Sequence, residues 1–239
     1  MTARKTATIK KARPAPKRAV AVEVRSALAS LERKSTKRDR DNLKRFGITA
    51  ERFLGVSMSN MKALAKELGR SHELADALWK TGIYEARMLA TLVDEPERVT
   101  PAQMDRWCRD FDNWAICDTA CFCLFDRTPH AWGRVKAWSR RRDEFQKRAA
   151  FALLACLAAH DKGTGDKPFL DGLRLVEAAA YDDRNFVKKG VSWALRGIGR
   201  RNRALRPTAV KLARRLADSQ VPASRWIGKD ALRDFAKLR

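Results

Sequence analysis

The sequence lacks any long apolar run. Its longest apolar stretch, residues 149–159, is far shorter than a membrane-spanning helix and follows two basic residues. The N-terminus is basic but has no apolar segment behind it, which argues against a secretory signal. No Pro-, Gly- or Ser-rich linker divides the 239 residues. We therefore expect no membrane segment and a single elongated domain over residues 21–239.

Cysteine and histidine are few, and their spacing does not suggest a metal site. The five cysteines lie in apolar helical segments and are odd in number, which favours buried, reduced thiols in a cytoplasmic protein. Cys117 and Cys121 share a helix face but Cys123 does not, so three thiolates would not converge on a metal ion. We expect neither a metal nor another cofactor, and a monomer. The histidines are scattered without ligand spacing: His72, His130 and His160.

Acidic residues are in the minority. Lys and Arg number 51 against 28 Asp and Glu, which gives a formal charge of +23 and a pI near 10.5. Such a surplus is typical of a chain that binds a polyanion, with nucleic acid the first candidate and an anionic membrane surface the second. Residues 1–20 are basic and contain no acid. They predict a disordered arm that contacts phosphates, or a solvated tail that aids solubility.

The apolar spacing is helical from Val22 onward, so the predicted fold class is all-α. Ser57 and Ser71 are placed to cap helices at their N-termini, and Gly47 and Gly69 to end them. Proline at position 101 suits the first turn of the next helix. Later helices are predicted at residues 102–111, 114–125, 131–140, 144–160, 169–180, 185–200, 207–217 and 223–238.

A repeat of roughly 30–40 residues runs through these helices. The segments IYEARMLATLV, WAICDTACFCL, FQKRAAFALLA, FVKKGVSWALR and RWIGKDALRDF align in one register. Helix pairs of this kind stack into a HEAT-like α-solenoid with a concave surface. One column of the register holds Arg87, Asp118, Arg148, Lys189 and Lys229. It predicts either a basic stripe for a DNA backbone or ion pairs between adjacent repeats, and both can hold at once.

Asp118 is the acidic member of that column. It lies four residues after Trp114 in the stretch DFDNWAICDTACFCLF, so both share one helix face. Trp193 lies one turn beyond Lys189 on the same face. A carboxylate weakens DNA binding in such a groove unless a cation lies against it. That cation is Arg148 or a cationic substrate, and the stretch alone favours a structural pair.

Three segments resemble the AlkD-like DNA alkylation repair glycosylases. They are WAICD at 114–118, KRAAFALLACLA at 147–158 and NFVKKGVSWALRGIGRRN at 185–202, within a resemblance that extends from about residue 54 to 238. In that family a tryptophan and a catalytic aspartate one turn apart match Trp114 and Asp118. A groove arginine matches Arg148, and a second groove tryptophan matches Trp193.

The resemblance implies a monofunctional DNA glycosylase of base excision repair. Such an enzyme hydrolyses the N-glycosidic bond of 3-methyladenine and 7-methylguanine in duplex DNA, without flipping the base and without a cofactor. Asp118, Trp114 and Trp193 are then the expected catalytic residues. The expected DNA-binding residues are Arg148, Arg87, Lys189, Lys188 and Lys229.

The sequence departs from this family at two places. Relatives commonly carry an aspartate directly after the first tryptophan, where this chain has Ala115, and Phe46 is the nearest candidate for a third aromatic residue near the N-terminus. These departures keep open a non-catalytic solenoid that binds damaged, bent or branched DNA, with Asp118 paired to Arg148. A third alternative, an adaptor for an acidic protein, depends only on the solenoid and the charge.

Overall fold

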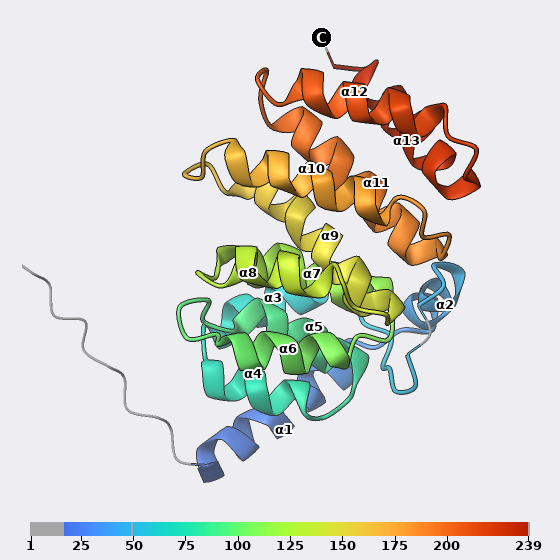
Figure 1. Cartoon of the computed structure of the whole chain (residues 1–239). Coiled ribbons are helices and arrows are strands. Elements are labelled where there is room, and N and C mark those ends of the chain that lie inside the picture. Colours follow the sequence, from blue (N-terminus) through green and yellow to red (C-terminus); the bar gives the residue numbers. More distant parts are fainter. Residues whose placement is uncertain (1–16, 49, 239) are drawn as a thin grey trace, which may run out of the picture.

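The computed structural model describes residues 17–48 and 50–238, and these residues form helices with no strand among them (Figure 1). The predicted all-α class is confirmed. The α-helices are α1 (Lys17–Arg33), α2 (Lys37–Arg45), α3 (Met58–Leu68), α4 (His72–Trp79), α5 (Tyr84–Val93), α6 (Pro101–Arg109), α7 (Trp114–Cys123), α8 (Ala131–Trp138), α9 (Glu144–His160), α10 (Lys167–Ala179), α11 (Asn185–Arg201), α12 (Arg206–Ala217) and α13 (Pro222–Phe235).

Helix starts follow the predicted caps. The Ser57 and Ser71 side chains accept hydrogen bonds from the third residue of their helices, and Thr100 caps α6 with proline in its first turn. Gly47 and Gly69 adopt positive φ, as residues that end helices commonly do.

Several predicted boundaries differ from the structure: the helices predicted to end at residues 111, 140 and 238 end two or three residues earlier. Residues 17–20, predicted as part of the basic arm, belong to α1, and the rest of that arm lies outside the described residues. Helix α7 ends at Cys123 because Leu124 leaves the helical region at φ −133 and ψ −60, and a 3₁₀ turn, η1 (Phe125–Arg127), follows.

The helices stack in two layers. One layer consists of α5, α7, α9, α11 and α13, each of which packs against the next. The other layer consists of the helices that precede them in the chain, α4, α6, α8, α10 and α12. Figure 1 shows this stack running from α1 at one end to α12 and α13 at the other. The arrangement confirms the predicted α-solenoid. We call the layer of odd-numbered helices from α5 to α13 the inner layer.

Helix α9 is the centre of the stack. It contains the longest apolar run of the sequence, and residues 147–158 are all buried. Gly190 of α11 lies against it, and a Cβ there would come within 3.4 Å of Arg148 Cγ, so glycine allows the two helices to approach closely. No helix in the described part of the chain is long and apolar enough to cross a membrane.

A buried carboxylate anchors the segment between α2 and α3. Glu85 is 0% exposed and accepts hydrogen bonds from three backbone amides, those of Leu54 (2.8 Å), Gly55 (2.6 Å) and Val56 (3.3 Å). The three amides belong to a segment without regular secondary structure, so no helix or sheet carbonyl accepts from them. The Glu85 carboxylate accepts all three hydrogen bonds instead. This attachment fixes the chain just before it enters α3.

Glu85→Gln is expected to destabilise the protein by about 2 kcal/mol. One of the two accepting oxygens becomes an NH2 group, which donates and cannot accept from the buried backbone amides. Urea unfolding measures the change, with Glu67→Gln on exposed α3 surface as the matched control. Equal unfolding midpoints for the two variants would show that Glu85 does not anchor the segment.

Candidate active site and nucleic-acid interface

The start of α7 presents Trp114 and Asp118. The buried side chain of Asn113 accepts hydrogen bonds from the amides of Ala115 (3.0 Å) and Ile116 (3.1 Å), which fixes the first turn. Trp114 is the first residue of the helix and Asp118 follows one turn later, both partly exposed. Ala115, where relatives commonly have an aspartate, is buried.

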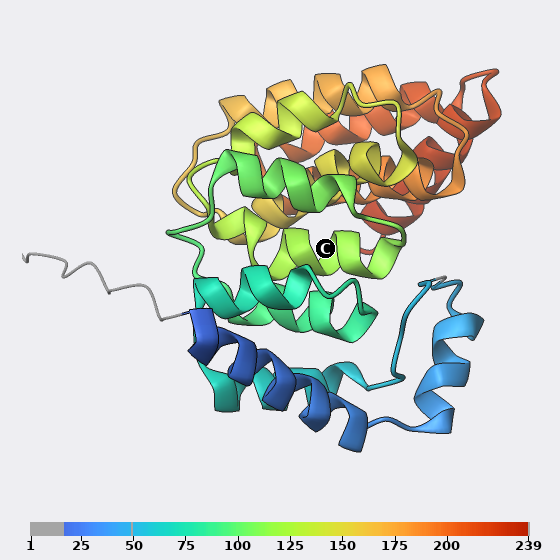
Figure 2. The same cartoon turned by 90° about the horizontal axis from the view of Figure 1, so that it is seen from below.

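Helix α2 returns to the inner layer and brings a second aromatic side chain to Trp114. The indole Nε1 of Trp114 donates a hydrogen bond to the backbone carbonyl of Phe46 (3.0 Å), and the Phe46 side chain is 59% exposed. Figure 2 shows α2 at the edge of the molecule, turned from the direction of α1. The fold thus places the sequence's candidate for a third aromatic beside the first tryptophan.

Trp114→Phe is expected to loosen this contact while keeping an aromatic ring. Loss of one hydrogen bond costs about 1 kcal/mol, so tryptic cleavage after Arg45 should become about fivefold faster. Trp226→Phe on α13 is the control. Cleavage at the wild-type rate in Trp114→Phe would mean that the bond to Phe46 does not hold α2.

Asp118 and Arg148 form a bidentate ion pair. Arg148 Nε donates to Asp118 Oδ1 (2.8 Å) and Nη2 to Oδ2 (2.6 Å), while Nη1 donates to the carbonyl of Phe186 (2.8 Å). Arg148 is 6% exposed and the Asp118 side chain 19%. Pairing between adjacent repeats, one of the two uses left open by the sequence, is therefore present at this position.

The geometry of the pair decides its charge state. Both Asp118 oxygens face guanidinium nitrogens, which only donate, so both oxygens must accept and the carboxyl is ionised. Burial raises the pKa of Asp118, and the charge and hydrogen bonds of Arg148 oppose that rise. Asp118 therefore carries a negative charge, has low solvent exposure and is paired with Arg148.

Asp118 and Trp193 line one hollow, and Trp114 and Arg148 line another. The first hollow, about 210 Å³, also includes Met58 and Lys62 of α3. The second, about 480 Å³, includes Phe46. Asp118 lines the first hollow and Arg148 the second, so their ion pair lies between the two. The four residues predicted from the family resemblance are thus brought together on α7, α9 and α11.

The other predicted cations differ in what they contact. Lys189 is exposed and lines the hollow of Trp114. Arg87 donates to the carbonyl of Asp110 (3.2 Å) and lies over the ring of Trp79, so its charge is used within the protein. Lys188 lies 5.1 Å from the ring centroid of Trp226. Lys229 is exposed on α13 and lines neither of the two hollows.

Two cationic hollows extend the site and were missed from the sequence. Lys62 is shared between the Asp118 hollow and a hollow of about 390 Å³ that contains Lys66 and Arg70. Trp193 is shared with a hollow of about 250 Å³ that contains Lys162 and three arginines. The i, i+4 spacing of Lys62 and Lys66, and of Arg196 and Arg200, could have revealed them. We call these four hollows together the groove.

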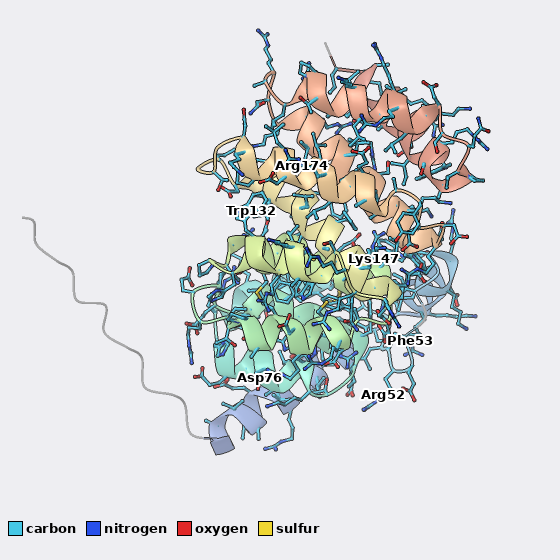
Figure 3. All side chains as sticks on the ribbon, viewed as in Figure 1. Arg52, Phe53, Asp76, Trp132, Lys147 and Arg174 are labelled. Atoms are coloured by element: carbon cyan, nitrogen blue, oxygen red, sulfur yellow. The ribbon has the colours of Figure 1, made fainter. Side chains whose placement is uncertain are left out.

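The opposite layer differs in charge balance. A hollow between α8 and α10 is lined by Trp132 and Arg174, both labelled in Figure 3, and by Lys136 and Asp171. Asp171 accepts hydrogen bonds from Arg174 (2.9 Å) and from Lys167 (2.9 Å). Arg174 therefore has an acidic partner within the protein, whereas Lys62 and Lys162 of the groove have none among the described residues.

Cysteines and histidines contribute no metal centre within the described residues. No group of three potential ligands lies close enough to hold an ion. All five cysteines are free, and all but Cys123 are buried, as predicted. His72 and His160 each bond a buried aspartate, Asp94 and Asp126 respectively.

Comparison with known proteins identifies the family. Residues 27–235 match the sequence model of the family described as DNA alkylation repair enzyme. The chain belongs to the DNA alkylation repair enzyme family. No curated protein matches it. A solved structure described as "a new family of proteins related to the HEAT-like repeat DNA glycosylases with affinity for branched DNA structures" superposes with a TM-score of 0.74.

That superposition covers 88% of this chain and 94% of the other, at 21% sequence identity. At this identity the superposition shows a common fold and nothing more, and the HEAT-like repeat architecture predicted from the register is confirmed. The family match extends from α1 to the last residue of α13 and therefore includes every helix that lines the groove.

Proposed function

We propose that this DNA alkylation repair family member is a monofunctional DNA glycosylase. Its substrates are cationic alkylated purines, 3-methyladenine and 7-methylguanine, in duplex DNA. The observation that carries the proposal is the ionised Asp118 carboxylate, which opens on a hollow walled by Trp193 in an otherwise cationic groove. Arg148 balances this charge within the protein, and the Asp118 side chain is still 19% exposed, so a cationic base or sugar in the hollow can also face it.

The chemistry of the lesion fits this arrangement. Alkylation at N3 or N7 makes the base a cation and a good leaving group, so the glycosidic bond breaks towards an oxocarbenium sugar. Asp118 stabilises that charge as carboxylates do in sugar hydrolysis, and orients the attacking water. Trp114 and Trp193 offer π faces to the developing cation and keep bulk water away.

Arg148 acts mainly by positioning Asp118. It is buried and donates to the Asp118 carboxylate and the Phe186 carbonyl, so phosphate contacts fall to exposed cations such as Lys189 and Lys62. Contacts between these cations and the DNA phosphate backbone are compatible with a lesion that stays in the duplex, as the family resemblance implies. One chain supplies the whole groove, so we propose that the protein acts as a monomer. We also propose that it acts in the cytoplasm.

Single-turnover release of free base tests the proposal. Methylated duplex DNA is mixed with enzyme in excess, and released 7-methylguanine and 3-methyladenine are separated from the DNA and quantified. Release well above spontaneous depurination is expected, with neutral damaged bases left in place. If the protein binds the duplex but bases are released no faster than by spontaneous depurination, the glycosylase proposal is wrong.

A second candidate is recognition of branched or bent DNA without catalysis. The observation in its favour is that Arg148 already occupies both oxygens of Asp118, as a purely structural pair would. The solved structure that shares this fold is also described as having affinity for branched DNA structures. Tighter binding to a three-way junction than to a methylated duplex, with no base released from either, would select this function.

A further inference from the structure

One hollow of the groove is not used by the proposed chemistry. It lies between α9 and α11 and is walled by Trp193, Arg196, Arg200 and Arg201, with Lys162 from the loop after α9. Its volume is about 250 Å³, and it shares Trp193 with the Asp118 hollow. We call it the arginine hollow. A ligand in it would lie next to whatever occupies the Asp118 hollow.

Small residues make the floor of the arginine hollow. Gly197 of α11 faces Ala155 and Ala158 of α9, and a Cβ on Gly197 would lie 3.4 Å from the Ala155 Cα. The two helices therefore approach closely here, and no large side chain fills the space above them. The residue at the outer end of the floor, Ala159, is exposed.

The arginines are held in place by the protein. Arg201 donates to the carbonyl of Thr164 (2.7 Å) and stacks 4.0 Å from the ring centroid of Phe169. Arg200 Nε donates to Asp234 of α13 (2.7 Å). Each guanidinium has five N–H donors, and these contacts use only some of them. The Nε atoms of Arg196 and Arg201 are buried, so the donors that remain for a ligand are those on the terminal Nη atoms.

Positive charge is in excess at this position. Four cations line the hollow, and the carboxylates that partly balance them, Asp230 and Asp234, belong to α13 and do not line it. Lys162 is exposed and has no hydrogen-bond or ion-pair partner within the described residues. Fixed guanidinium groups with free donors match the oxygens of a phosphate, which offer several acceptors at once.

We propose that the arginine hollow is a binding site for a backbone phosphodiester of DNA. The inference depends on the proposed function only in that the groove binds DNA. The bound phosphate belongs to the strand that passes Trp193, so it sets the register of the duplex and with it which nucleotide faces Asp118. The site contributes affinity and placement, while the chemical step belongs to Asp118.

Salt-dependent DNA binding tests this site. Lys162→Ala is compared with Lys136→Ala, which removes the same charge from the hollow between α8 and α10. Fluorescence anisotropy with a labelled, unmodified duplex is measured over a range of NaCl concentrations. For Lys162→Ala we expect a several-fold loss of affinity and a plot of log K against log[NaCl] that is shallower by about 0.9, the loss of one phosphate contact. Lys136→Ala should leave both unchanged.

A second variant fills the hollow without changing its charge. Ala159→Trp should weaken duplex binding at least as much as Lys162→Ala, and circular dichroism melting checks that it folds. The proposal is overturned if Lys162→Ala binds as the wild type does, or if Lys136→Ala matches it.

Base release separates this proposal from the previous one. An absence of base release by the wild type would overturn the glycosylase proposal but not the phosphate site, because the binding assay uses undamaged DNA.

Discussion

Asp118→Asn is expected to lower the single-turnover rate of 7-methylguanine release by about tenfold or more, which corresponds to about 1.4 kcal/mol of transition-state stabilisation. Asparagine keeps the size of the side chain and one acceptor oxygen but removes the negative charge. The charge is what would stabilise an oxocarbenium sugar, so the loss should appear in the rate at saturating enzyme. Affinity for undamaged duplex should stay the same or rise, since a negative charge has left a cationic groove.

A matched control separates catalysis from charge in general. Asp112→Asn removes an exposed carboxylate just before α7, whose nearest cation, Arg87, is 4.0 Å away. It should release base at the wild-type rate. If Asp118→Asn also excises 7-methylguanine at that rate while the wild type is active, Asp118 has no catalytic role and the carboxylate serves only to pair with Arg148.

Arg148→Met is expected to produce the largest loss of stability among the groove variants. Removing one partner of a buried ion pair leaves the other charge uncompensated, at a cost of about 3 kcal/mol or more. The Phe186 carbonyl also loses its donor. For a chain of this length the melting temperature should fall by roughly 6–12 °C. Differential scanning calorimetry measures the change.

The double variant Asp118→Leu/Arg148→Met shows where the cost comes from. Apolar side chains of similar volume can replace a buried ion pair with little loss, so the double variant should recover much of the stability lost in Arg148→Met. It should remain inactive, because the carboxylate is gone. Full activity in the recovered double variant would contradict the role of Asp118. A double variant no more stable than Arg148→Met would instead contradict the account of the unpaired charge.

The sequence predicted the helices well because the signals for them are local. An N-cap such as Ser57 bonds to a residue three positions away, and the apolar spacing of α9 repeats every three to four residues. Predictions failed where a local signal was weak. The end of α7 depends on the backbone turn at Leu124, which has no glycine or proline to mark it.

The groove was predicted in part. The repeat register identified Arg148 and Lys189, which line it, but it also selected Arg87, whose charge is used by the Asp110 carbonyl and the Trp79 ring. It did not identify Lys62 and Lys162, because α3 and the loop after α9 lie outside the aligned segments. A register defines equivalent positions, and it carries no information on which partner each side chain binds.

The sequence by itself determined the all-α class, the stacking of repeats, the positive charge and the placement of Trp114 and Asp118 on one helix face. These follow from residue type and spacing within one or two helical turns. Only the tertiary structure decided that Phe46 meets Trp114, 68 residues away, and that Arg148 clamps Asp118 across 30 residues. The physical reason is that a hydrogen bond needs its partners within about 3 Å, and for distant residues that distance is set by how whole helices pack.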